Sequence, residues 1–68
     1  MKNELDNLPI DEWLYQGTNL KAQHLLVVYN AEVGEYEPVF VMPDENLEEK
    51  RNRYNEGLYR LAGDLTIN

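Results

Sequence analysis

The residues that decide the fold of this chain are His-Leu-Leu-Val-Val-Tyr, residues 24–29. The run is apolar, rich in β-branched side chains and of strand length, which is typical of a buried strand. A helix is the alternative, because five residues in this part of the chain would share one helix face: Leu20, His24, Val27, Val28 and Ala31. The sequence that follows favours the strand.

A second apolar run, residues 36–42, follows after a short loop that contains Gly34. Two such runs around a glycine-containing loop predict an antiparallel β-hairpin, with strands at about 23–30 and 36–42. Pro38 removes a backbone donor, so we expect the second strand to lie at a sheet edge. Which face of the hairpin is buried stays open, because both strands are apolar on more than one parity.

A short helix is predicted before the hairpin, at about residues 9–16. Ile10, Trp13 and Leu14 follow at i, i+3 and i+4, the spacing of one helix face. Gly17 is the expected C-terminal stop. A helix of this length is stable only when it docks on another surface.

A longer amphipathic helix is predicted after the hairpin, at about residues 44–62, with Asp44 as its N-cap. Its apolar stripe has four members: Leu47, Tyr54, Leu58 and Leu61. Gly57 inside this helix indicates either close packing on the sheet or a kink. Gly63 is expected to end the helix. Alternation after it predicts a short closing strand at about 64–67.

These elements define a single α+β domain over residues 1–68: a short N-terminal helix, an antiparallel hairpin, one longer helix packed on the sheet, and a short C-terminal strand. A chain of 68 residues buries only about 60% of its unfolded surface. It has no cysteine, so disulfides and thiolate metal sites are excluded, and a homodimer is one source of the missing stability. With no signal-peptide core and no membrane-length apolar run, we expect a cytoplasmic protein.

Charge is the most unusual property, with 13 acidic against 6 basic residues and a net charge of −7. This balance disfavours direct binding to nucleic acid or to anionic membranes. No lysine or arginine stands between Lys21 and Lys50. Glu35 and Glu37 are expected to point the same way, about 7 Å apart. The predicted partner-binding residues all lie in this interval: Glu32, Glu35, Tyr36, Glu37, Asp44, Glu45, Glu48 and Glu49.

The acidic interval has three interpretations. Charged residues around a hairpin and a helix start protect edges from aggregation and favour solubility. Alternatively, they form a docking face for a basic protein surface, with tyrosines as anchors. A divalent cation site at Asp44, Glu45, Glu48 and Glu49 is disfavoured, because consecutive helix acids point in different directions and no calcium-binding loop is present.

The sequence offers little for catalysis. It contains no serine and no cysteine, and its aliphatic hydroxyls are Thr18 and Thr66, so the commonest nucleophiles are missing. His24 is the lone histidine and is interpreted as a strand-end residue with a satisfied hydrogen bond. The four glycines stand far apart and form no phosphate loop. We expect no catalytic residue, no cofactor and no metal, and therefore no enzyme.

In size and charge the chain resembles small acidic proteins of phages and mobile elements that inhibit host nucleic-acid enzymes. This resemblance rests on composition. It implies a non-enzymatic domain that binds the basic surface of another protein, and specifically an inhibitor that mimics nucleic acid. The alternative is a structural or regulatory homo-oligomer, a dimer formed through a strand edge or the aromatic surface.

Overall fold

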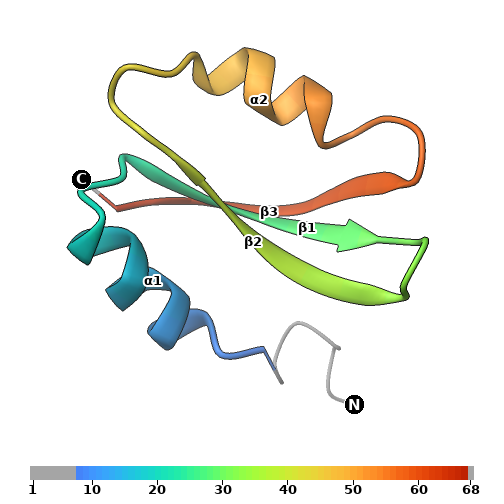
Figure 1. The fold of residues 1–68 in the computed structure, drawn as a ribbon, viewed down its shortest axis with the longest axis horizontal. Coiled ribbons are helices and arrows are strands. Elements are labelled where there is room, and N and C mark those ends of the chain that lie inside the picture. The colour runs from blue at the N-terminus through green and yellow to red at the C-terminus, as the bar shows by residue number, and fades with distance from the viewer. Residues whose placement is uncertain (1–7, 68) are drawn as a thin grey trace.

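The sheet is built around the apolar run and carries one helix on each face (Figure 1). The computed structural model describes residues 8–67. Within them the chain is α+β, as predicted, and its three strands form one antiparallel sheet in the order β2-β1-β3. The elements in chain order are α1 (Ile10–Asn19), β1 (His24–Asn30), β2 (Glu35–Val41), α2 (Leu47–Arg53) and β3 (Tyr59–Thr66).

Strand β1 is central, and this explains its continuous apolar sequence. Its four residues 25–28 are at most 3% exposed, because strands flank both of its edges and helices cover both of its faces. The predicted hairpin is confirmed, with β1 paired to β2 from His24 opposite Val41 to Asn30 opposite Glu35. Pro38 lies opposite Val27 on an edge strand, as expected from its missing donor.

Both faces of the hairpin are buried, which resolves the parity left open by the sequence. On the α2 face, Leu26, Val28 and Val41 form a cluster, and Leu47 and Tyr54 from the α2 region pack against it. The other face belongs to α1, which lies on the opposite side of the sheet in Figure 1.

Helix α1 does not end at Gly17, so the predicted stop there is wrong. Gly17 is buried inside the helix, where an added Cβ would collide with Ile67 and lie 3.0 Å from the Phe40 ring. The glycine permits close packing on the sheet. The helix ends instead before Lys21, whose φ of 63° is the left-handed conformation that commonly follows a helix.

The predicted helix over 44–62 is largely wrong, because α2 covers only Leu47–Arg53. Asn46, rather than Asp44, is the N-cap, and its side chain accepts a hydrogen bond from Glu49 N. Gly57 has a φ of 64° and lies in a turn, not in a helix.

Strand β3 begins at Tyr59, well before the predicted 64–67, and Gly63 lies inside it. Its residues alternate between half-buried and exposed along the whole strand, which is the period of a sheet surface. The physical reason is pairing, because β3 satisfies the second edge of β1 from His24 to Asn30.

Candidate functional site

The predicted acidic residues fall into two groups rather than one row. Near the β1–β2 turn are Glu32, Glu35 and Glu37, and around the start of α2 are Asp44, Glu45, Glu48 and Glu49. The two ends of the seven-residue strand β2 are about 20 Å apart. The structure therefore brings together only the members within each group.

The turn-end group lies where two turns meet. Ala31 N in the β1–β2 turn donates a hydrogen bond of 2.9 Å to the carbonyl of Leu58 in the α2–β3 turn, and both turns lie at one end of the sheet (Figure 1). Val33 and Leu58 are 59% and 55% exposed there. We define the turn-end patch as Glu32, Val33, Glu35, Glu56 and Leu58, all of them exposed.

Sequence reasoning missed three residues of this patch. Leu58 is predicted as part of a helical core stripe, Glu56 falls inside the same predicted helix, and Val33 carried no signal of its own. They belong to the patch because the chain turns at Gly57 and places the second turn beside the first. A turn signal at Asn55-Glu56-Gly57 was available, since glycine after polar residues is typical of turns.

Glu37 lies outside the turn-end patch, because its carboxylate is engaged in a hydrogen bond within the fold. Its carboxylate accepts a hydrogen bond of 3.1 Å from Asn30 Nδ2, and Asn30 Oδ1 accepts one of 2.9 Å from Glu32 N. Asn30 is 9% exposed, so this pair of bonds satisfies a buried amide and holds the turn. Glu37 is therefore a supporting residue of the turn.

Tyr36 lies on the face opposite to Glu35 and Glu37, because successive strand residues alternate. Its ring contacts Tyr29 edge-on, with centroids 5.0 Å apart and an interplanar angle of 60°. Tyr54 and Tyr59 make a similar contact at 5.4 Å and 73° on the α2 side of the fold. Aromatic pairs of this geometry stabilise the sheet end by about 1 kcal/mol each beyond area burial.

The negative charge of the helix-start group is partly balanced by the lysine of α2, Lys50. Lys50 Nζ donates to both carboxylate oxygens of Glu45, at 2.8 and 2.7 Å, and to Phe40 O at 3.0 Å. The hydrogen bond from Lys50, helped by one from Met42 N, lowers the pKa of Glu45. Within residues 8–67, no group of three or more histidines and carboxylates could hold a metal ion.

Replacing Lys50 by methionine is expected to raise the pKa of Glu45 towards its usual value, about 4.3. Because the folded-state pKa is lowered, the pair stabilises the fold above the unfolded-state pKa, and this contribution is lost as the pH falls through the folded value. Carbon-detected NMR titration of the carboxyl groups measures the shift. Arg51→Met removes the same charge from the same helix and should leave Glu45 almost unchanged; an equal effect would contradict the local cause.

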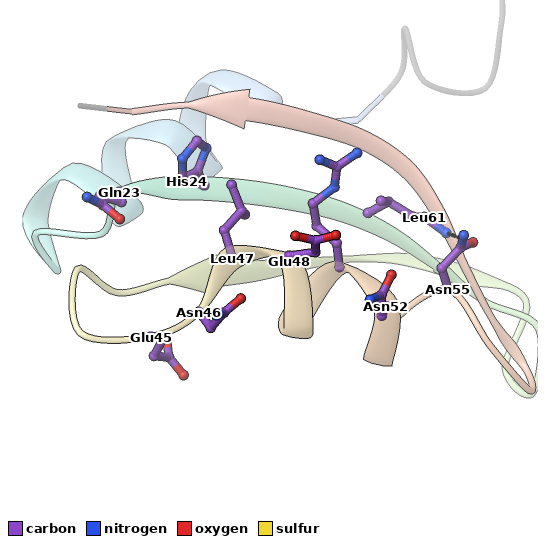
Figure 2. Close-up of a pocket in the computed structure, with 10 residues that line it drawn as sticks. Gln23, His24, Glu45, Asn46, Leu47, Glu48, Asn52, Asn55 and Leu61 are labelled. Atoms are coloured by element: carbon purple, nitrogen blue, oxygen red, sulfur yellow. Dashed lines mark hydrogen bonds between the residues drawn. The ribbon is translucent and has the colours of Figure 1, made fainter.

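A cleft of about 710 Å³ lies between α2 and the sheet (Figure 2). His24 Nδ1 is 3.5 Å from one oxygen of Asp64, and Arg51 Nε is 3.6 Å from the other. The prediction that His24 opens the strand is confirmed, but its expected hydrogen bond is missing, since Nδ1 is buried without a partner in hydrogen-bond geometry. Three elements thus meet at this polar cluster.

Both edge strands carry features that oppose the addition of another strand. On β2, Pro38 lacks a donor and the Phe40 carbonyl is bound by Lys50. On β3, the register shifts opposite Val27 and Val28, and Leu61 N donates to Asn55 Oδ1 at 3.1 Å. Proline, bulges and charges at edges are the usual protection against edge-to-edge pairing.

The described residues form a three-stranded antiparallel sheet between two short helices. No family model, curated protein or solved structure matches this chain. In the described part of the chain, neither helix has the length and apolar character needed to cross a membrane.

Proposed function

We propose that this chain is a non-enzymatic protein-binding domain whose turn-end patch engages a basic surface of a partner protein. One observation carries the proposal: the Ala31–Leu58 hydrogen bond joins two turns that together present exposed apolar side chains among carboxylates. An apolar centre with a charged rim is the usual anatomy of a protein interface.

Charge supports the basic nature of the partner. Glu32, Glu35 and Glu56 are exposed in the patch, and the whole chain carries −7. Arg60 is opposite Tyr29 in the sheet, and its Nη1 donates to the carbonyls of Gly57 and Tyr59 at 3.4 and 3.3 Å, so one positive charge lies beside the three carboxylates of the patch. Carboxylates around an apolar contact steer a basic partner and disfavour acidic ones.

The specific version of the proposal is an inhibitor that mimics nucleic acid. In this version the exposed carboxylates of the turn-end patch, Glu32, Glu35 and Glu56, would take the places of phosphates in a groove of the partner. Competition decides this version: duplex DNA or RNA should displace the partner as salt does. If nucleic acid does not reduce the capture of the partner, the proposal is restricted to a basic surface that does not bind nucleic acid.

The test compares two charge reversals of equal size. Glu32→Lys with Glu35→Lys alters the turn-end patch, and Glu48→Lys with Glu49→Lys alters the helix start. Each changes the net charge from −7 to −3, so only position differs. The immobilised variants are exposed to lysate of the source cells, and bound proteins are quantified by mass spectrometry.

The patch reversal is expected to reduce capture of the partner about tenfold, since two contacts of about 0.7 kcal/mol each are lost. The helix-start reversal should reduce it much less. Equal losses from both would mean that net charge alone is responsible, and unchanged capture by the patch variant would refute the surface. Recovery of this chain alone would favour the homodimer instead.

An uncharged variant separates the apolar centre from the acidic rim. Val33→Ser with Leu58→Ser should weaken capture at every salt concentration while its salt dependence stays unchanged. Both side chains are more than half exposed, so the fold should lose little stability.

A further inference from the structure

The cleft beside α2 is independent of the turn-end patch and has the size of a ligand site. Its volume of about 710 Å³ lies within the range of small-molecule pockets. Leu47 and Leu61 contribute apolar surface to it, and polar side chains from the α2 region surround them (Figure 2). An apolar floor with a few polar groups is the usual composition of such a site.

Several polar groups of the cleft are unused donors. Asn55 Oδ1 accepts from Leu61 N, and Asn46 Oδ1 accepts from Glu49 N, so both side chains leave their NH₂ groups unoccupied. Arg51 meets Asp64 through Nε at 3.6 Å, and its two terminal nitrogens make no hydrogen bond within residues 8–67. A ligand that supplies acceptors would pair with these donors.

Asp64 lies beside Arg51 and His24 and leaves the terminal nitrogens of Arg51 open to the cleft. Its contacts to His24 and Arg51, at 3.5 and 3.6 Å, are longer than hydrogen bonds of 2.7–3.2 Å. The carboxylate orients the guanidinium from its Nε side, and the opposite side keeps the planar fork that matches a second carboxylate. Arg51 is 47% exposed, so that fork is accessible from solution.

We propose that this cleft binds an organic carboxylate, with the terminal nitrogens of Arg51 on the carboxylate and its apolar part against Leu47 and Leu61. Glu45 and Glu48 also line the cleft. The Glu45 carboxylate is paired with Lys50, whereas that of Glu48 opposes the ligand's charge. A free small acid and the C-terminus of a peptide share this chemistry.

Titration of the isotope-labelled protein with phenylacetate, followed by amide NMR, tests the proposal. A ligand of this size should bind with a Kd on the order of 5 mM. Saturable shifts are expected at Leu47, Arg51 and Leu61. Phenylacetamide, which has the same shape without the charge, should give none.

An acetylated Ala-Phe dipeptide with a free C-terminus, compared with its amide, tests whether the natural ligand is a peptide terminus. Tighter binding than phenylacetate assigns the site to a peptide terminus, and weaker binding assigns it to a free acid.

Three variants give the expected order of affinity. Arg51→Gln should weaken phenylacetate at least tenfold, Arg51→Lys should weaken it less because it keeps charge without the fork, and Glu48→Gln should strengthen it about twofold. Arg53→Gln is the matched control, since Arg53 is on the same helix and does not line this cleft. The absence of saturable shifts up to about 50 mM, equal shifts with phenylacetamide, or unchanged binding in a folded Arg51→Gln variant would each overturn the proposal.

Discussion

Leu26→Ala is expected to destabilise the domain more than any surface change, by about 3 kcal/mol. Leu26 is fully buried in the central strand and belongs to the cluster under α2. Removing its side chain loses transfer free energy and leaves a cavity that neighbouring strands and α2 cannot fill without moving. A domain of this length has a total stability of about 3 to 10 kcal/mol, so the loss is a large part of the whole.

Thermal melting followed by circular dichroism measures the effect, and the midpoint should fall by about 15 °C. Leu20→Ala is the matched control, because it deletes the same atoms from a side chain that is 53% exposed. It should change the free energy of unfolding by no more than about 0.5 kcal/mol. Similar shifts in the two variants would contradict the assignment of Leu26 to the core.

Gly17→Val is the second large effect, with an expected loss of about 2 kcal/mol. An added Cβ collides with Ile67 and lies 3.0 Å from Phe40 Cε1, so α1 must move away from the sheet. The helix propensity of valine exceeds that of glycine by only a few tenths of a kcal/mol, which does not offset the clash. Urea unfolding of the variant measures the difference.

A rescue experiment identifies the cause of this loss. The atom of Ile67 that meets the new Cβ is Cδ1, and Ile67→Val removes it. The double variant should therefore be more stable than the two single losses predict, by about 1 kcal/mol. Additive losses would mean that valine at position 17 acts through the helix itself and not through packing on the sheet.

The hairpin was predictable because its information is local. The apolar run at 24–29 is too continuous for a half-exposed strand, Gly34 follows at turn distance, and Pro38 requires an edge. Each of these signals acts over a few residues and needs no knowledge of the partner elements. The predicted bounds accordingly differ from β1 and β2 by at most one residue at each end.

The second half was mispredicted because its pattern suits two structures. Leu58 and Leu61 are three apart, as on a helix face, but residues from Tyr59 onward also alternate as on a strand. Local propensity does not distinguish these. The second edge of β1 favours the strand, because without β3 its buried donors and acceptors would have no partners. Leaving them unpaired costs more free energy than a longer helix would gain.

The candidate surfaces show the same division. The sequence indicated the acidic residues of the 22–49 interval as candidates. In the fold they form two groups separated by the length of β2, and Lys50 binds the carboxylate of Glu45. The hydrogen bond from Ala31 N to Leu58 O placed the turns that carry Val33 and Leu58 side by side. His24, Arg51 and Asp64, which line or support the cleft, are 27 and 13 residues apart along the chain.

The sequence by itself determined the α+β class, the central hairpin and the strongly acidic character, since these follow from composition and from periodicity over a few residues. Only the tertiary structure decided where α2 ends, that β3 closes the second edge of β1, and which side chains share the patch and the cleft. The physical reason is that backbone hydrogen bonds and charge contacts between distant segments depend on which surfaces meet in space, and a local pattern does not contain that information.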